Sequence, residues 1–450
     1  MIPFKFKWNL GQLPLQELRP NKANNAKPNN TFFMAQDFNK VQTISDFILT
    51  FDLQTFLSEN GQLSPETFLL QCKDNTKEQN WYLAEQLKLY PKAKYKLPSF
   101  TNALCWFTGK SYEQCSSEAS AKLKSSLFNG GKLLDLSGGL GVDDVYFSES
   151  FKEVISLDPD ENLNILTEAN FKKLQKFNIK RLNETAESFL ETNKLRFSLI
   201  YLDADRRTSN QKSKLLETGS PDFFALEEKL YEFTDDILLK LSPLIDIDYC
   251  LENLRFIKQI MVVSVDFEVK EVLCHLSKNH QNEVTISNYF LNKNGEIEGK
   301  IESNNIERKS KFEFTKPQDS KYFFEASPGL IKSGLDKLYA YQKNLYPINQ
   351  NGFYFISENN HSTDTGFGRY FEIVSKSQFS KSHFKEYLKK HSINQANISA
   401  RDFGMSVDEI KKMFSIKDGS DEYFFFGRDD DKTKLFFHTR KNNVSINRDK

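Results

Sequence analysis

Two spacings of apolar residues divide the chain. From about residue 46 to residue 94, apolar side chains recur every three or four positions, as on the buried face of a helix. Pro98 ends this run, and a further helix is predicted over 112–127. These patterns predict a helical amino-terminal domain over 33–127, preceded by an Asn-, Lys- and Pro-rich flexible lead over 1–32.

Farther along the chain, short apolar runs alternate with segments of helical length. Strands are predicted at 132–136, 153–158, 179–183, 197–203, 237–241 and 259–265. Helices are predicted at 143–150, 163–177, 226–231, 246–254 and 268–277. Repeated strand–helix units favour an α/β fold with a mostly parallel sheet and helices on both faces. Residues 283–291 either close this sheet or open the next domain, and the remainder has an α+β pattern.

The turn after the first strand is rich in glycine. Ser137, Gly138, Gly139 and Gly141 follow the strand directly, and the next helix begins at once. A strand, a glycine turn and a helix bring bare backbone N–H groups to the carboxyl edge of a sheet, where open α/β sheets bind their ligands. Asp158 ends the second strand, so its carboxylate can accept hydrogen bonds from the two hydroxyls of an adenosine ribose.

The residues at this turn narrow the choice of nucleotide. A phosphate-binding loop needs Gly-Lys-Ser/Thr, whereas Val and Asp follow Gly141. A dinucleotide fold needs a third glycine or alanine where Asp144 stands. Asp143 and Asp144 also make the helix start acidic, which disfavours an anion. S-adenosylmethionine has no phosphate and carries a sulfonium cation that Asp135 can face. We therefore predict the cofactor loop of a class I methyltransferase.

Two further carboxylates are candidates for the cofactor site. Glu184 follows the third strand, where an acid often meets the adenine amino group, and a helix-capping role is the alternative. Glu113 precedes the α/β region and could cover the cofactor, and the alternative is an ordinary helix start.

The fourth strand ends in the residues predicted to carry the chemistry. In class I methyltransferases that modify base amines, an Asp or Asn at the position of Asp203 holds the amine and aims its lone pair at the methyl group. Asp205 could hold the amine too. Arg206 and Arg207 stay protonated, so they could clamp a phosphate or stack on a base but not accept a proton. Lys240 could pair with Asp203 or Asp205 or contact the substrate. Surface salt bridges and a solvated lysine are the structural alternatives.

Charge and cysteine content limit the possible partners. The formal net charge is +0, but residues 366–450 hold 17 Lys/Arg against 12 Asp/Glu, so this region would feel a phosphate backbone most. Five scattered cysteines without a C-x-x-C motif predict reduced thiols and a cytoplasmic location. No apolar run is long enough to span a membrane, so no membrane partner is expected. The nearest metal-ligand pattern is Cys274-His275 with His280, and its spacing is poor, so no metal is expected either.

Several motifs together resemble the bacterial class I methyltransferase family with a C-terminal THUMP-like domain, common in the Bacteroidetes lineage. They are Lys94–Pro98, Glu113–Glu118, Asp135–Asp143, Asp203–Arg207, Lys240–Pro243, Pro328–Lys332, and Gly366 through Phe403. The resemblance implies a Rossmann-like methyltransferase domain over 128–280, a ferredoxin-like domain over 281–365 and a THUMP-like domain over 366–450. It also implies S-adenosylmethionine as cofactor and, because true THUMP domains bind RNA, an RNA substrate. Ala204-Asp205 departs from the family's Pro-Ala, which concerns substrate geometry more than cofactor binding.

Three functions fit these observations. The first is methylation of a base nitrogen in rRNA or tRNA. The second is an RNA-binding protein with a methyltransferase fold that no longer turns over, which the variation at Ala204 motivates. The third is methylation of a protein or a small molecule, which the zero net charge favours.

Overall fold

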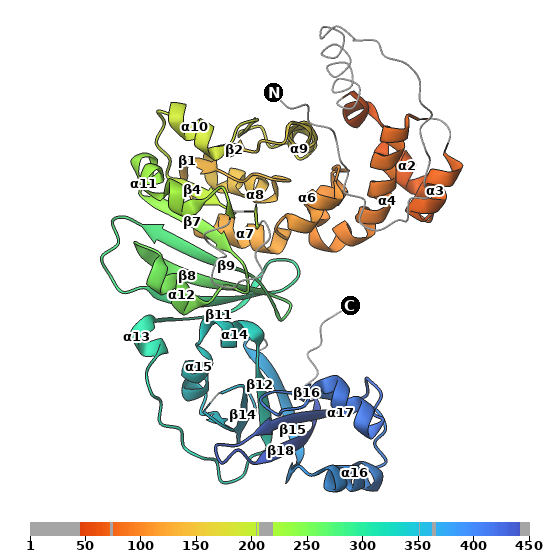
Figure 1. Ribbon diagram of the computed structural model, residues 1–450, viewed down its shortest axis with the longest axis vertical. Coiled ribbons are helices and arrows are strands. Elements are labelled where there is room, and N and C mark those ends of the chain that lie inside the picture. Colours follow the sequence, from red (N-terminus) through yellow and green to blue (C-terminus); the bar gives the residue numbers. More distant parts are fainter. Residues whose placement is uncertain are drawn as a thin grey trace, which may run out of the picture.

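The computed structural model describes residues 46–72, 75–203, 205–206, 219–350, 352–361 and 366–441 (Figure 1). The predicted lead over 1–32 therefore lies outside the described residues.

The amino-terminal part is helical, as predicted. Residues 46–50 are helical and are followed by α2 Leu53–Asn60, α3 Pro65–Gln71, α4 Lys77–Lys96, α5 Pro98–Asn102, α6 Gly109–Gln114 and α7 Glu118–Leu127. A capping box between Thr76 and Gln79 starts α4, the longest of these helices. The buried indole of Trp106 donates to the carbonyl of Ile48 at 3.0 Å and anchors the first helical turns to the rest of this domain.

A nine-stranded sheet forms the middle of the molecule. Its strands are β1 Gly130–Asp135, β2 Phe151–Leu157, β3 Ile179–Leu182, β4 Leu199–Leu202, β7 Asp236–Leu241, β8 Ile257–Val265, β9 Glu268–Ser277, β10 Thr285–Leu291 and β11 Ile297–Asn304. Their order is β11-β10-β8-β9-β7-β4-β1-β2-β3. Strands β1 to β4, β7 and β8 confirm the six predicted strands. The carboxyl ends of β1, β4, β7, β8 and β10 all reach one edge of the sheet.

Helices cover both faces of this sheet, as predicted for a doubly wound fold. They are α8 Val142–Ser150, α9 Glu161–Lys173, α10 Ala186–Thr192, α11 Phe223–Phe233 and α12 Ile247–Asn253. Successive residues of β1 point to opposite faces, so Leu133 packs with α7 and α8 whereas Leu134 packs with α10, α11 and α12.

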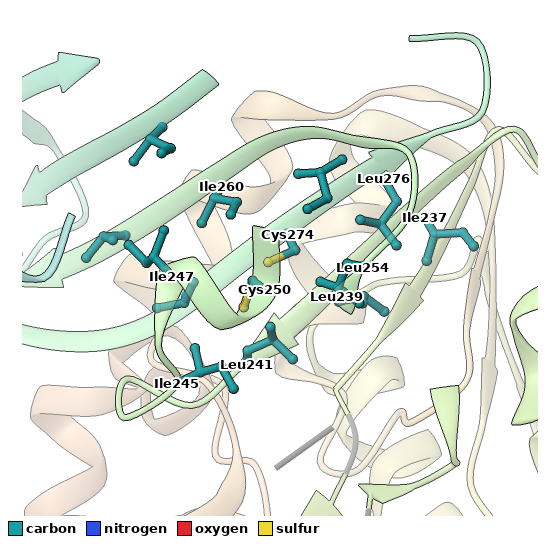
Figure 2. Close-up of a cluster of buried hydrophobic side chains, with 14 of the residues drawn as sticks. Ile237, Leu239, Leu241, Ile245, Ile247, Cys250, Leu254, Ile260, Cys274 and Leu276 are labelled. Carbon is teal, nitrogen blue, oxygen red and sulfur yellow. The ribbon is translucent and has the colours of Figure 1, made fainter. Parts of the chain in front are cut away.

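The predicted helix over 268–277 is wrong, because this segment is strand β9. It pairs antiparallel with β7 and with β8. Seven consecutive residues of β9 are buried, so no alternation of polar and apolar positions marks it as a strand. Figure 2 shows Cys274 and Leu276 of β9 packed in the core with Cys250 of α12 and with Leu254, which follows that helix.

The chain continues the same sheet past residue 280. Strand β10 pairs parallel with β8, and β11 pairs antiparallel with β10. These strands lie in the segment assigned to a separate domain over 281–365, so that boundary is corrected to about residue 304.

A seven-stranded sheet forms the carboxyl-terminal part. Its strands are β12 Tyr322–Ala326, β13 Tyr346–Pro347, β14 Tyr354–Ser357, β15 Gly368–Gln378, β16 Asn397–Ala400, β17 Glu422–Arg428 and β18 Lys434–Lys441. The helices here are α13 Asn305–Arg308, α14 Pro328–Ser333, α15 Asp336–Gln342, α16 Lys381–Lys390 and α17 Val407–Phe414. Because β12 pairs with both β14 and β15, the boundary predicted between residues 365 and 366 runs through one continuous sheet.

The two sheets share a hydrophobic core. Leu330 of α14 and Phe324 of β12 belong to the same cluster of buried side chains as Phe290 of β10. In Figure 1 α14 lies where the two sheets meet. No helix within the described part of the chain is long and apolar enough to cross a membrane.

Candidate active site

The glycine loop lies between β1 and α8, as predicted, and its shape depends on two of its glycines. Gly141 caps α8 with φ of 76°, and a Cβ there would lie 2.5 Å from the ring of Phe171. A Cβ on Gly138 would lie 1.9 Å from Nη1 of Arg181. Larger residues would therefore displace either the loop or the side chains beneath it.

Ser137 joins the cofactor loop to the end of β4. Its hydroxyl donates to Oδ1 of Asp135 at 3.0 Å and accepts from the backbone N–H of Asp203 at 2.7 Å. Its own backbone N–H also donates to Oδ1 of Asp135, at 2.7 Å. One side chain thus brings together a residue predicted to bind cofactor and a residue predicted to hold the acceptor.

Asp158 lies beside the glycine loop, at the end of β2. Its carboxylate accepts from the N–H of Gly139 at 3.1 Å and from the N–H of Asp160 at 2.9 Å. The side chain is 15% exposed. Since each carboxylate oxygen can accept two hydrogen bonds, both retain capacity for the predicted ribose hydroxyls.

The carboxylates of Asp143 and Asp144, at the start of α8, are not exposed to the cofactor site. Asp143 forms an ion pair with Lys124 at 2.9 Å and accepts a hydrogen bond from the hydroxyl of Tyr201 at 2.8 Å. Asp144 accepts from the hydroxyl of Ser156 at 2.5 Å. Buried partners hold both carboxylates, so these two residues exclude an anion less strongly than the sequence suggested.

Burial and neighbouring charge set the protonation of these acids. Burial raises the pKa of Asp144 to about 6, although the guanidinium of Arg181 acts to lower it. Burial, with the charge of Asp144, raises the pKa of Asp135 well above its usual value. Burial also acts to raise the pKa of Asp143, but Lys124 and Lys240 outweigh it and the net shift is downward. Asp135 and Asp144 therefore keep a proton at higher pH than Asp143 does.

Arg181 of β3 supports the glycine loop from below, and the sequence analysis missed it. Its guanidinium is 1% exposed and donates to Asn164 Oδ1, to Ser156 Oγ and to the carbonyl of Gly139, each at 2.7 Å. It also lies 3.5 Å from Asp158. The available signal was an arginine inside a short strand, a residue type that is rarely buried unless its donors are satisfied.

Lys240 of β7 forms an ion pair with Asp203, one of the possibilities that its sequence position left open. Burial acts to lower the pKa of Lys240, but the charges of Asp203, Glu271 and Asp143 raise it above its usual value. Lys240 therefore stays charged and holds one carboxylate oxygen of Asp203. The carboxylate is 29% exposed.

Lys124 of α7 was also missed by the sequence analysis. Its fully buried ammonium lies 2.9 Å from Asp143 and 3.0 Å from Glu271 of β9, and it donates to Ser116 Oγ at 3.0 Å. These contacts tie the last amino-terminal helix to the middle of the sheet. No signal in the sequence marked Lys124, because its partners are 19 and 147 residues away.

The remaining predicted residues are less closely connected to the site. Glu184 is partly exposed between β3 and α10, and the adjacent Thr185 caps α10. Glu113 is exposed on α6. Asp205 and Arg206 form the short strand β5, which pairs with β6 Gly219–Ser220, but their side chains lie outside what the structure describes. Arg207 lies outside the described residues altogether.

The comparisons with known proteins concern the fold of the chain. The THUMP domain-like family matches residues 368–441. The crystal structure of a "putative methyltransferase" from Porphyromonas gingivalis W83 aligns with a TM-score of 0.75 and 26% identity, over 88% of this chain and 98% of that chain. The chain has the class I methyltransferase fold, with a THUMP-like domain at its carboxyl end.

Other solved structures align over shorter stretches. An rRNA methylase from Streptococcus thermophilus covers 36% of this chain and 95% of its own, with 13% identity and a TM-score of 0.27. TrmK from M. capricolum, in complex with S-adenosylhomocysteine, covers 38% of this chain and 73% of its own, with 11% identity and a TM-score of 0.28. At these scores the two alignments carry no argument. No curated protein sequence matches the chain.

Proposed function

We propose that this methyltransferase transfers the methyl group of S-adenosylmethionine to a base nitrogen of RNA. The observation that carries the proposal is the Ser137 side chain, which joins Asp135 in the cofactor loop to Asp203 at the acceptor position. Cofactor and acceptor sites then meet at one edge of the sheet, in a chain that also carries a THUMP-like domain.

The cofactor loop fits a cationic nucleoside better than a phosphate. The carboxylate of Asp158 lies beside Gly139 of the loop and is 15% exposed, whereas the buried cation nearest to the loop, Arg181, donates to groups of the fold. Asp158 would hold the ribose. The wall against the methionine end of the cofactor would be formed by Asp135, Ser137, Gly138, Gly139 and Gly141. Glu184 would lie at the adenine, and Glu113 would cover the cofactor. S-adenosylmethionine supplies an electrophilic methyl group, and the residues of the chain orient what attacks it.

Asp203 would position the acceptor amine. Lys240 occupies one carboxylate oxygen, so the other oxygen would accept a hydrogen bond from the amine and turn the nitrogen lone pair toward the methyl group. Asp205 would assist, while Arg206 and Arg207 would hold a phosphate or stack on a base. In this assignment the proton acceptor is a carboxylate. A carboxylate suffices, because the amine loses its proton only after the methyl group has been transferred.

The THUMP-like domain would supply affinity for the RNA backbone. Helix α16 exposes four lysines along its length, which are Lys381, Lys385, Lys389 and Lys390. Lys412 of α17 adds another exposed cation on the same domain. Several cations on one domain release counterions from a phosphate backbone and give salt-dependent binding without sequence preference.

One observation favours a second candidate function. The Lys240 ammonium already forms an ion pair with Asp203, so only one oxygen of this carboxylate is left for an acceptor amine. A chain that binds RNA and cofactor without transferring the methyl group would have the same geometry.

A methyl-transfer assay separates these functions. Purified full-length protein is incubated with tritium-labelled S-adenosylmethionine and, separately, with total RNA, protein and small-molecule fractions from a bacterial extract. We expect label in the RNA fraction, and nuclease digestion locates it on a base. Label in the protein or metabolite fraction would contradict the RNA substrate. Cofactor binding without label in any fraction would support the second candidate.

A further inference from the structure

A cavity of about 580 Å³ lies at the substrate edge of the nine-stranded sheet, away from the cofactor loop. Its wall comes from the hairpin between β8 and β9, from the turn after β10, and from Gly366, where the chain enters β15. Because β8, β9, β7 and β4 are successive neighbours, the cavity lies at least about 14 Å from Asp203, at about 4.8 Å per strand. One extended ligand could reach both places.

The hairpin at this cavity holds an aromatic residue in an unfavourable backbone conformation. Its two turn residues, Asp266 and Phe267, have φ of 51° and 66°. Two-residue hairpin turns of this kind favour Asn-Gly, and a bulky residue at positive φ is rare because its Cβ crowds the backbone. The Phe267 side chain is nonetheless 40% exposed and lines the cavity.

Phe256, at the opposite end of β8, is a natural comparison for Phe267. Its φ is 56° and its exposure is 39%. The Phe256 ring packs against Tyr231 at 5.3 Å between centroids and lies under the guanidinium of Arg255 at 5.6 Å. Within the described residues no such ring contact exists for Phe267, so aromatic and cation contacts account for the placement of Phe256 but not for that of Phe267.

Polar groups and charge at the cavity narrow the chemistry of a ligand. Ser264 lines the cavity, but it is 2% exposed and its hydroxyl lies against Gly329 of α14, so it is closed to a ligand. Of the charged residues in the wall, Asp266 and Glu298 outnumber Lys293, which is paired with Asp266 at 3.0 Å. A phosphate would be repelled, whereas a neutral planar ring could stack on Phe267.

We propose that this cavity binds a nucleobase that flanks the methylated position, stacked on Phe267. The proposal rests on the proposed function, because it takes the ligand to be single-stranded RNA. It assigns base contact to the methyltransferase sheet itself and leaves backbone contact to the THUMP-like domain.

The test compares full-length wild type with Phe267→Ala, Phe267→Gly and, as matched control, Phe256→Ala. Each binds fluorescently labelled single-stranded oligoribonucleotides, and abasic strands of the same length, in the absence of cofactor. We expect wild type and Phe256→Ala to prefer the base-bearing strand, and both Phe267 variants to bind it about tenfold more weakly while binding the abasic strand equally well. A base preference that persists in Phe267→Ala would overturn the proposal.

Thermal unfolding separates a ligand role from a structural one. Glycine adopts positive φ without cost, so Phe267→Gly should keep or raise the melting temperature while weakening base binding. A lower melting temperature with unchanged base preference would show that Phe267 serves the fold, and would overturn the proposal. Failure of methyl transfer with intact base-dependent binding would contradict the proposed function alone. Loss of binding to both strands in wild type would overturn both.

Discussion

Two buried cations support the two halves of the active site in different ways. Arg181, below the cofactor loop, donates to one amide, one hydroxyl and one backbone carbonyl, with carboxylates farther away at 3.5 and 3.6 Å. Lys124, on the acceptor side, lies within 3.0 Å of two carboxylates. Directed hydrogen bonds therefore shape the cofactor side, and charge pairing holds the acceptor side. Loss of either cation should damage a different property.

The largest effect should follow removal of the Lys124 charge. Lys124→Met leaves Asp143 and Glu271 buried without their nearest cation, and breaking a buried ion pair in this way costs about 3–5 kcal/mol. Denaturant unfolding should show this loss of stability. Lys122→Met is the control, because Lys122 is exposed on the same helix. A loss below about 1 kcal/mol would show that the charge network contributes little to stability.

The cofactor side should be more sensitive to geometry than to charge. Arg181→Lys keeps the positive charge but cannot reach three acceptors in different directions. We expect a loss of about 2 kcal/mol in binding of S-adenosylmethionine, measured by calorimetry. Lys180→Met, an exposed neighbour on β3, should leave the affinity unchanged. Full affinity in Arg181→Lys would mean that charge alone suffices there.

A pH titration sharpens the contrast further. Burial raises the folded-state pKa of Asp144 from 3.8 to about 6, so this group contributes stability that is fully present below pH 3.8 and lost as the pH rises to about 6. At about 1.4 kcal/mol per unit the loss is about 1–3 kcal/mol. Asp144→Asn removes this group's contribution, so the unfolding free energy of the variant should fall less than that of wild type across the same interval. If the unfolding free energies of the two proteins changed in parallel with pH, the raised pKa of Asp144 would be contradicted.

The smallest effects should come from exposed lysines of the THUMP-like domain. Lys389→Ala with Lys390→Ala removes two exposed cations from α16, and the slope of log affinity against log salt should fall by about 0.7 for each lysine that contacts single-stranded RNA. Lys411→Ala is the matched control, because Lys411 is already paired with Asp418. Equal slopes for all three proteins would place the RNA backbone on another surface.

The sequence predicted what depends on neighbours along the chain and missed what depends on contacts across it. The glycine loop and the strands that end at Asp158 and Asp203 are local patterns, and the sheet edge brings them together as expected. The Lys124–Glu271 contact joins residues 147 positions apart, so no local pattern marks it.

The predicted helix over 268–277 failed for a related reason. A strand buried on both faces shows no alternation, and its turn residues Asp266 and Phe267 lack the usual glycine. The domain boundaries at 280 and 365 failed because the pairing of β10 with β8, and of β12 with β15, is decided by contacts far apart in the chain.

The central claim, that Asp203 positions the acceptor beside the methyl donor, is tested most directly by the single-turnover rate of methyl transfer in wild type and Asp203→Ala. Cofactor affinity is measured on the same samples. We expect the rate to fall on the order of a hundredfold with cofactor affinity unchanged, because the lost contact is made to the acceptor. Asp203→Asn, which keeps an acceptor oxygen, should fall less. A wild-type rate in Asp203→Ala would contradict the account and place the positioning group elsewhere.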